Sequence, residues 1–409
     1  MNTLLTSSIR THRSVFSQSG VTAQLLQKGF RLNHRMQTLE QLFNGQDVIE
    51  MNGPVATSVR ALCTDSRRVT PGALFFALPG LRTKGHLYIE EAIDRGAIGV
   101  VTETKEWVPR KTALIVVEDV RAVLAETARR FHRNPEKGLS LIGVTGTSGK
   151  TVVSTLVRQF LSETEPVGLL GTIHYALGVR TLPAYRTTPE PVDLYAMLSQ
   201  MKEGGCRKAV MEVSSHGIDQ GRVSELPFEA LAFLNLSTQH LEYHGSMDNY
   251  FDTILQAFDG RNHPQPKKAV VNLDDPYGRK LLEAVKGTMK TTTFGIESEG
   301  ATVTAKDIEY RVNDTRFTVC AEGKEWRVVS PLIGEFNVSN VLAAMAIARE
   351  EKQSWETIIR RLFEFEGVRG RMERVDCGQS FNVIVDYMHT AESYAQGLDM
   401  LRGITEGRL

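Results

Sequence analysis

The chain has 409 residues, of which 41% are hydrophobic and 23% charged, an ordinary composition for a globular protein of roughly two to four domains. Its 48 basic and 48 acidic residues balance, so the bulk charge gives no indication of a nucleic-acid partner. No apolar run approaches the roughly 18 residues that span a bilayer, and the four cysteines lie far apart without metal-binding spacing. We therefore expect a cytoplasmic monomer with no nucleic-acid partner, no membrane partner and no structural zinc.

Residues 1–38 form a basic extension without an acidic side chain, and Ser and Thr are frequent in it. Such a composition can mark an organelle transit peptide, but the stretch is short and lacks a continuous apolar run. We expect a disordered extension, or a natural start at Met36, and keep the transit peptide as the alternative.

The predicted elements of residues 39–136 alternate short apolar strands with helices. Strands are expected at 73–78, 97–101 and 113–117, and helices at 88–95 and 120–132. This pattern predicts a small α/β domain, and the Asn-Pro-Glu-Lys-Gly run that begins at Asn134 is typical of a linker.

Residues 137–366 repeat the alternation on a larger scale. Strands are expected at 140–145, 208–213, 230–236 and 268–273, with helices at 150–161 and 338–349 and a β-rich stretch at 291–329. Short apolar strands alternating with helices predict a mostly parallel sheet covered by helices on both faces.

Residues 367–409 contain one predicted strand, at 381–386, and room for one helix. A strand and one helix cannot bury a core of their own. We therefore expect an incomplete α/β C-terminal domain, either a remnant or the product of a coding sequence that is cut short.

The strongest local motif runs from Gly143 to Thr151 and reads GVTGTSGKT, between a predicted strand and a predicted helix. Glycines let backbone N–H groups turn toward a phosphate, and the positive end of the helix dipole adds to the attraction. Lys150 would reach the terminal phosphates and Thr151 would bind Mg²⁺. The strict phosphate-loop pattern requires glycine at Val144, so a glycine-rich turn with a chance lysine is the alternative.

Two further groups follow predicted strands of the same unit. Glu212 stands at the carboxyl end of a strand, where phosphate-loop enzymes hold Mg²⁺, although a lone glutamate there would more often be a surface charge. His240 and His244 follow the next strand, four residues apart, and a role in the site and a structural role are about equally supported for both.

Several motifs together, in this order, resemble those of the Mur ligase family. They are the loop at Thr145–Thr151, Thr187-Thr-Pro-Glu, Met211-Glu-Val-Ser-Ser-His, Asn235-Leu with His240-Leu-Glu-Tyr-His-Gly, Asn272-Leu-Asp-Asp-Pro, Gly334-Glu-Phe-Asn-Val-Ser-Asn, Gly370-Arg-Met-Glu and Asp386-Tyr-Met-His-Thr. The Glu-Val-Ser-Ser-His form and the N-terminal Thr64-Asp-Ser-Arg-Arg run are similar to the tripeptide-forming branch of that family, MurE. The likeness extends from about Leu39 to Leu409.

The resemblance implies three α/β units: a nucleotide-sugar-binding domain (39–136), a central ATP-binding domain (137–366) and the incomplete C-terminal domain (367–409). It also implies a ligase that joins an amino acid to UDP-N-acetylmuramoyl-L-alanyl-D-glutamate through an acyl phosphate, with ATP and Mg²⁺, in peptidoglycan synthesis. The residues it implies for ATP are Gly146, Thr147, Ser148, Gly149, Lys150, Thr151, Asn340, Arg371 and Asp386. Those for Mg²⁺ are Thr151, Glu212 and His240, and the catalytic set is Lys150, Glu212 and His240. Those for the nucleotide-sugar peptide are Ser66, Thr187, Thr188, Ser214, Gln220 and Arg222.

The sequence departs from the family pattern at several of these motifs. Ile254 stands where the family has a lysine that becomes carbamylated and bridges a second Mg²⁺, and Gln239 replaces an aspartate before the loop histidine. Glu335 replaces a basic residue, and Ala391 replaces a proline. The Asp-Asn-Pro-Arg motif that selects the incoming amino acid in the family is absent from the sequence.

Three hypotheses follow. The first is a working ligase, supported by the loop, Glu212, His240 and Arg222. The second is a truncated or degenerate paralogue that binds ATP and the UDP-sugar peptide without ligation, supported by Ile254 and the missing motif. The third is a related ligase for another substrate, such as a folate-polyglutamate enzyme, which the N-terminal Asp65-Ser-Arg run and Thr187-Thr-Pro disfavour.

Overall fold

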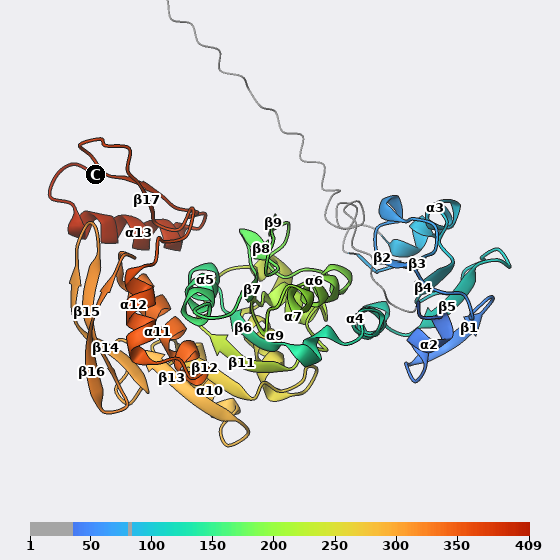
Figure 1. The fold of residues 1–409 in the computed structure, drawn as a ribbon, viewed down its shortest axis with the longest axis horizontal. Helices are drawn as coiled ribbons and strands as arrows, with labels where there is room; N and C mark the ends of the chain where they lie inside the picture. Colours follow the sequence, from blue (N-terminus) through green and yellow to red (C-terminus); the bar gives the residue numbers. More distant parts are fainter. Residues whose placement is uncertain (1–35, 81–83) are drawn as a thin grey trace, which may run out of the picture.

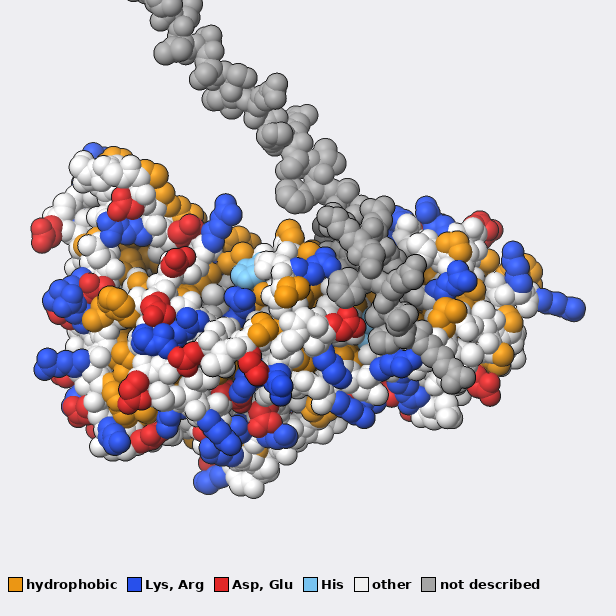
Figure 2. Space-filling view, viewed as in Figure 1, with side chains coloured by type: hydrophobic (Ala, Val, Ile, Leu, Met, Phe, Trp, Pro, Cys, Tyr) orange, Lys and Arg blue, Asp and Glu red, His pale blue; other side chains and the backbone are white. Residues whose placement is uncertain are grey.

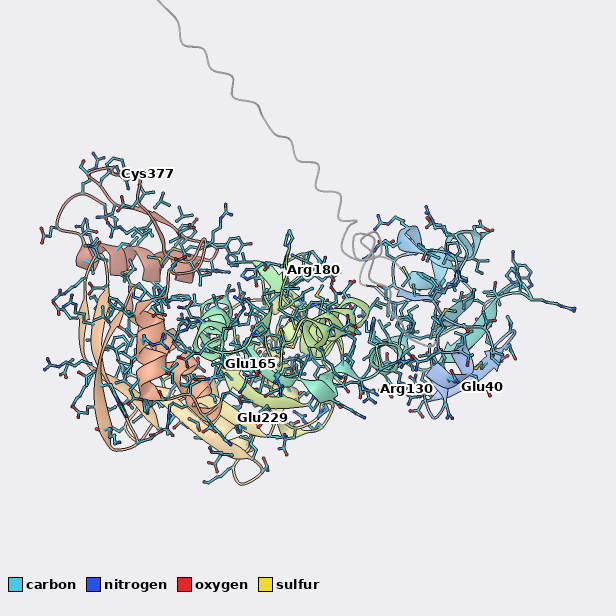
Figure 3. The ribbon with its side chains drawn as sticks, viewed as in Figure 1. Glu40, Arg130, Glu165, Arg180, Glu229 and Cys377 are labelled. Atoms are coloured by element: carbon cyan, nitrogen blue, oxygen red, sulfur yellow. The ribbon has the colours of Figure 1, made fainter. Side chains whose placement is uncertain are left out.

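The computed structural model describes residues 36–80 and 84–409. They form three units in chain order, with the N-terminal unit at one end, the large central sheet in the middle and the C-terminal unit at the other end (Figure 1). Glu40 and Cys377 mark these opposite ends (Figure 3). The prediction for residues 1–38 falls almost entirely outside the described residues. None of the helices in the described ranges is long and apolar enough to cross a membrane.

The N-terminal unit contains a five-stranded sheet in the order β1-β5-β4-β3-β2, parallel except for β1. Its elements are α2 (Leu39–Phe43), β1 (Val48–Asn52), β2 (Ala61–Cys63), the 3₁₀ turns η1 (Ser66–Arg68) and η2 (Gly85–Tyr88), β3 (Ala73–Phe76), α3 (Ile89–Asp94), β4 (Gly99–Thr102), β5 (Ala113–Val117) and α4 (Val120–Phe131). The three predicted strands and both predicted helices are confirmed, with shifts of one or two residues at their ends. The α/β prediction for this unit is therefore confirmed.

The central unit is built on an eleven-stranded sheet in the order β16-β15-β14-β13-β12-β11-β6-β10-β7-β8-β9, as far as the chain is described. The strands from β7 to β14 across its middle pair in parallel, and antiparallel hairpins extend both edges. Its strands are β6 (Ser140–Thr145), β7 (Val167–Leu170), β8 (His174–Ala176), β9 (Thr181–Pro183), β10 (Lys208–Glu212), β11 (Phe228–Phe233), β12 (Lys268–Asn272), β13 (Lys290–Gly295), β14 (Val303–Tyr310), β15 (Thr315–Ala321) and β16 (Lys324–Ser330). The mostly parallel sheet predicted from the sequence is confirmed.

Helices cover both faces of this sheet. They are α5 (Lys150–Leu161), α6 (Pro191–Glu203), α7 (Ser215–Asp219), α8 (Leu241–His244), α9 (Met247–Asp259), α10 (Pro276–Ala284), α11 (Glu335–Glu350) and α12 (Trp355–Phe363). The 3₁₀ turn η3 (Pro135–Gly138) joins α4 to β6. Helix α11 begins at Glu335, three residues before the predicted start, because Glu335 and Asn337 in its first turn interrupt the apolar periodicity.

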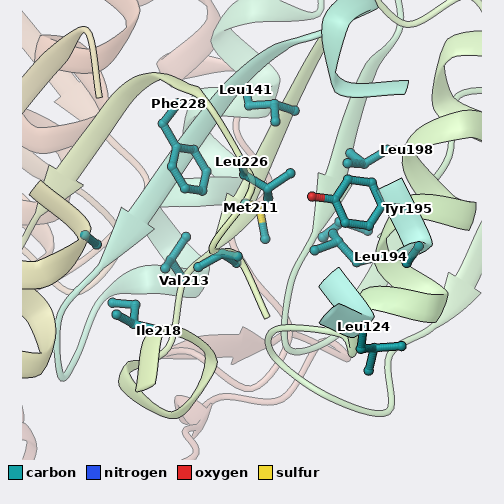
Figure 4. Packing of buried hydrophobic residues seen from close by; sticks show 14 of the residues in the cluster. Leu124, Leu141, Leu194, Tyr195, Leu198, Met211, Val213, Ile218, Leu226 and Phe228 are labelled. Atoms are coloured by element: carbon teal, nitrogen blue, oxygen red, sulfur yellow. The ribbon is translucent and has the colours of Figure 1, made fainter. Parts of the chain in front are cut away.

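The strand residues alternate between two hydrophobic clusters. In β10, Met211 belongs to the cluster that contains α6 and α9, whereas Val210 belongs to the cluster that contains α5 and α11. Side chains on a strand point alternately to opposite faces, so both faces of β10 are buried. Figure 4 shows the first cluster, in which Tyr195 and Leu198 of α6 lie near Met211 and Leu226. The buried sheet fixes the carboxyl ends of the parallel strands, where the candidate site lies.

The C-terminal unit consists of β17 (Glu373–Val375), β18 (Val383–Val385) and α13 (Ala391–Ile404), with the two strands antiparallel. The strand predicted at 381–386 is shorter than expected, because Phe381 and Asn382 precede the paired residues. Phe381, Tyr394 and Leu398 are exposed. Helix α13 approaches the central unit, since a Cβ placed on Gly334 would lie 3.1 Å from Cγ of Met400.

Candidate active site

The phosphate loop connects the end of β6 to the start of α5. Gly149 has a φ of 87° and directly precedes Lys150, and a Cβ at this position would lie 2.2 Å from Oδ1 of Asn340. Only glycine fits both this conformation and this close approach. The first N–H groups of a helix have no intrahelical acceptor, and at α5 the N-cap residue Gly149 has no side chain to accept from them. These N–H groups therefore remain available to a ligand in the cavity that Gly149, Lys150 and Thr151 line.

Two asparagines brace the loop from outside. The Ser148 N–H donates to Oδ1 of Asn235 at 2.9 Å, and Nδ2 of Asn235 donates to the Ser148 carbonyl at 3.2 Å. The Thr147 N–H donates to the backbone carbonyl of Asn235 at 2.9 Å. Asn340, at the back of Gly149, is held by a 3.0 Å bond from its Nδ2 to Oδ1 of Asn337. The loop conformation is thus supported by the segment that follows β11 and by α11.

Lys150 points back over the loop. Its Nζ donates to the carbonyls of Gly146 at 2.6 Å and Thr147 at 2.9 Å. Burial lowers the pKa of Lys150, while the Glu212 carboxylate opposes that effect. The ammonium is therefore partly desolvated and close to the position where phosphate oxygens would bind to the loop.

Glu212, at the end of β10, is 1% exposed and accepts hydrogen bonds from two segments. Its Oε2 accepts from the hydroxyls of Thr151 at 3.1 Å and Thr172 at 2.9 Å, and its Oε1 accepts from the Thr172 N–H at 2.8 Å. A Cβ on Gly171 would lie 2.7 Å from Oε1, so glycine at this position leaves space for the carboxylate. Carboxylate and hydroxyl oxygens converge here in the set that a hard cation such as Mg²⁺ prefers.

His240 lies beside this group with a φ of 59°. Its ring is 4.9 Å from that of His216, edge to face. Burial, and then the Lys150 charge, lower the pKa of His240, which favours the neutral ring that can coordinate a metal. His244 is different: it is buried, its Nε2 is 2.9 Å from Oγ of Ser215 and its ring stacks on Tyr250, so its contacts are those of a packing residue.

One cavity of about 650 Å³ joins these groups to the C-terminal unit. Figure 2 shows the surface hollowed between that unit and the centre of the molecule. The predicted ATP, Mg²⁺ and catalytic residues that line the cavity are Thr147, Ser148, Gly149, Lys150, Thr151, Glu212, His240, Asn340, Arg371 and Asp386. Gly146 contributes through its carbonyl contact with Lys150. Arg371 lies over the ring of Tyr387, 5.1 Å from its centroid, and Oδ2 of Asp386 accepts from the Met372 N–H at 2.7 Å.

The residues predicted for the nucleotide-sugar peptide divide into three places. Thr187 lines the cavity, and its Oγ1 is 3.0 Å from that of Thr172. Next to it, Thr188, Ser214, Gln220 and Arg222 form one bonded group: Arg222 donates to the Thr188 carbonyl at 3.0 Å and to Oε1 of Gln220 at 2.6 Å. Ser66 lies in η1 of the N-terminal unit, where its hydroxyl donates to Glu91 at 2.6 Å, and it is not among the described residues that line this cavity.

Thr172, Tyr387 and His389 are among the cavity-lining residues to which the sequence assigned no role. Thr172 follows the short strand β7, and its position at a strand's carboxyl end is the signal that was missed. Tyr387 and His389 belong to the Asp386-Tyr-Met-His-Thr motif, and both line the cavity. Nε2 of His389 lies 3.1 Å from Nε2 of Gln239, a contact between the C-terminal and central units that no local pattern predicts.

Ile254 lies in α9 and is fully buried in the hydrophobic cluster that also contains Tyr250 and Phe258. An aliphatic side chain there offers no metal ligand. Within the described ranges, no three His, Cys, Asp or Glu side chains gather in a way that could hold a metal ion. Thr151 and Glu212 share a 3.1 Å hydrogen bond and His240 lines the same cavity, so these three residues could hold Mg²⁺.

Comparison with known proteins decides the family. Residues 144–348 match the Mur ligase middle domain, and residues 58–132 match the Mur ligase family catalytic domain. The chain is 36% identical over 360 residues to UDP-N-acetylmuramoyl-L-alanyl-D-glutamate--2,6-diaminopimelate ligase of Caldanaerobacter subterraneus, which covers 88% of this chain and 73% of that protein. This chain belongs to the Mur ligase family.

Other Mur ligases agree in sequence and in structure. The enzyme of the same name from Solibacter usitatus is 38% identical over 354 residues, covering 86% of this chain and 71% of that protein. A solved structure of a UDP-N-acetylmuramoyl-L-alanyl-D-glutamate--2,6-diaminopimelate ligase superimposes with a TM-score of 0.76 at 26% identity, over 91% of this chain and 76% of that one. The resemblance to the Mur ligase family and to its MurE branch is thereby confirmed.

Proposed function

We propose that this Mur ligase uses ATP to join an amino acid to UDP-N-acetylmuramoyl-L-alanyl-D-glutamate. The observation that carries the proposal is the convergence of the braced loop, Lys150 and the Glu212 group on one cavity. The names of the relatives support this dipeptide as the acceptor and 2,6-diaminopimelate as the first amino acid to test.

The proposed reaction has two steps. An oxygen of the dipeptide's terminal carboxylate attacks the γ-phosphorus of ATP, which forms an acyl phosphate and releases ADP. The amine of the amino acid then attacks the acyl carbon, which forms the amide, expels phosphate and loses a proton. Both steps bring anionic or electron-rich groups together, so cationic and donor groups must neutralise charge at the reacting oxygens.

The residues of this chain have separate roles in that scheme. The loop N–H groups and Lys150 would bind and orient the phosphates, with Asn340, Arg371 and Asp386 around the rest of the nucleotide. Thr151, Glu212 and His240 would hold Mg²⁺, which supplies positive charge to the phosphate oxygens when bound. Thr187, Thr188, Ser214, Gln220 and Arg222 would hold the peptide end of the nucleotide sugar, and Ser66 would contact its nucleotide end.

The test is ADP release by the purified chain with ATP, Mg²⁺ and UDP-N-acetylmuramoyl-L-alanyl-D-glutamate, across a panel that includes diaminopimelate and lysine. Release that requires both the dipeptide and one amino acid supports the ligase. Binding of ATP and of the UDP-sugar peptide without release would overturn the proposal in favour of a non-ligating paralogue.

A further inference from the structure

Ion pairs join the N-terminal unit to the central unit. Nη2 of Arg68 lies 3.9 Å from Oδ1 of Asp193, and Nε of Arg129 lies 3.9 Å from Oε2 of Glu225. The first pair begins in the turn η1, where Arg68 stands two residues after Ser66. The side chains of Arg68 and Asp193 are 29% and 8% exposed, so water and salt screen this pair less than a pair on the open surface.

On the central side of this pair, Asp193 closes the segment that holds Thr187 and Thr188. Asp193 lies in the first turn of α6, and its other oxygen, Oδ2, accepts from the Tyr185 hydroxyl at 2.6 Å. Burial, and then the Asp193 carboxylate, raise the pKa of Tyr185, so this hydroxyl stays protonated and donates. The bond joins the two ends of residues 185–193, and both threonines lie between those ends.

The start of the same segment is held by Tyr175 of β8. The Tyr175 side chain is fully buried, and its hydroxyl donates to the Arg186 carbonyl at 2.5 Å and accepts from the Arg186 N–H at 3.0 Å. Its ring meets that of Tyr185 edge to face, with the centroids 5.7 Å apart. Because Thr187 follows Arg186 directly, Tyr175 and Asp193 together limit the positions that this part of the chain can take.

The turn that carries Arg68 is held within its own unit. The N-cap residue Asp65 accepts from the Arg67 N–H at 3.1 Å, and the buried Cys63 thiol donates to the Asp65 carbonyl at 3.0 Å. Ser66 and Arg68 therefore share one hydrogen-bonded turn, and a displacement of Arg68 displaces Ser66 with it.

We infer that Arg68 and Asp193 are positioning residues, which set the distance between the nucleotide end and the peptide end of the substrate site. The nucleotide end is marked by Ser66, and the peptide end by Thr187 and Thr188. The inference rests on the proposed function, because a UDP-sugar dipeptide that contacts both units binds best when both ends are already correctly spaced. A ligand without the peptide contacts one end only and gains nothing from the link.

The test compares two ligands by calorimetry, without turnover. UDP-N-acetylmuramoyl-L-alanyl-D-glutamate reaches both ends, and UDP-N-acetylmuramic acid lacks the dipeptide. Arg68→Gln and Asp193→Asn should each weaken binding of the dipeptide ligand about tenfold and change binding of the shorter ligand by less than about twofold. Retained affinity for the shorter ligand also shows that the variant is folded. Arg68→Lys keeps the charge and should weaken the dipeptide ligand by about threefold at most.

A double variant and a control separate this role from a general loss of structure. Arg68→Gln combined with Asp193→Asn should bind the dipeptide ligand no more than about twofold more weakly than either single variant, because both changes remove the same link. Tyr185→Phe removes the donor to Asp193, so it should weaken the dipeptide ligand and spare the shorter one. Arg360→Gln is the matched control, because Arg360 is 50% exposed and pairs with Glu163 inside the central unit. It should leave both affinities unchanged.

Equal losses for both ligands, no loss for either, or losses that add in the double variant would each overturn the inference. Any of these results would leave the ADP-release test of the proposed function unaffected. A wild-type chain that did not bind the dipeptide ligand would overturn the proposed function as well, so the two failures are distinguishable.

Discussion

Replacing Ile254 with lysine tests whether the surroundings of this position can still accept the lysine that the family pattern has there. The Ile254 side chain is 0% exposed and lies among apolar neighbours in α9. It shares a helix face with Tyr250, whose hydroxyl is 3.3 Å from that of Thr147 in the loop. A lysine must therefore extend past Tyr250 to reach the cavity, or bury its ammonium without a partner.

The cost of burying an unpaired ammonium determines how much stability the Ile254→Lys variant should lose. Leaving one charge buried costs about 3–5 kcal/mol, which corresponds to a fall in Tm of roughly 6–20 °C for a unit of this size. We expect the Tm of Ile254→Lys to lie that far below the Tm of the wild type. Ile254→Met is the control, and it should lower the free energy of unfolding by less than about 1.5 kcal/mol. Burial would lower the lysine pKa in the folded state, so the unfolded state binds more protons and the deficit should shrink as the pH rises toward 10.

The assay is thermal unfolding by circular dichroism between pH 7 and pH 10, with and without Mg²⁺ and bicarbonate. If Tm at pH 7 decreased by less than about 2 °C, the reasoning would be refuted, because the lysine would then have reached water or a partner. If such a variant also gained Mg²⁺-dependent turnover with bicarbonate, the cavity would still be built to receive a carbamylated lysine at this position.

Three other changes have expected outcomes. Lys150→Ala should weaken ATP binding about 100-fold or more, because it removes the cation of the loop, whereas exposed Lys324→Ala should leave calorimetric affinity unchanged. Gly149→Ala should destabilise the loop by about 1–2 kcal/mol from its positive φ alone and weaken ATP binding further, since its Cβ would displace Asn340; wild-type affinity would contradict this. Burial and then the neighbouring His240 lower the pKa of His216 to about 4. The unfolded state therefore binds more protons, and the free energy of unfolding should fall as the pH drops from about 6.5 toward 4. His216→Phe should flatten the plot of that free energy against pH over this range.

Where the sequence carried a strong local signal, it predicted the structure closely. The strand at 140–145 and the helix at 150–161 match β6 and α5 residue for residue. An apolar run, a glycine-rich turn and an amphipathic helix all agree over this stretch, so local propensity and tertiary packing select the same structure. Glu212 was found by the same reasoning, because the carboxyl end of a buried parallel strand places its last side chain in the site.

The parts that the sequence did not reveal depend on contacts between distant segments. Thr172 becomes part of the site only because β7 pairs with β10 and brings it to Glu212. The Gln239–His389 contact joins residues 150 positions apart. The roles of His240 and His244 were left open, and packing separates their surroundings: His244 is buried against Tyr250, while His240 lines the cavity. Spacing alone cannot make that distinction, because His240 precedes the short helix α8 and His244 ends it, only four residues apart.

The contacts that hold the loop backbone explain how Lys150, which donates to carbonyls of its own loop, could also bind the phosphates of a nucleotide. Lys150 donates to the Gly146 and Thr147 carbonyls, and under the proposed function these bonds would be exchanged for phosphate oxygens when ATP binds. The loop backbone is held independently, by Asn235 on one side and by the close approach of Asn340 to Gly149 on the other. The exchange therefore requires a change of lysine rotamer and little rearrangement of the backbone. Because preorganised donors lose little on binding, under the proposed function we expect the anchors at Asn235 and Asn340 to contribute to nucleotide affinity as the loop glycines do.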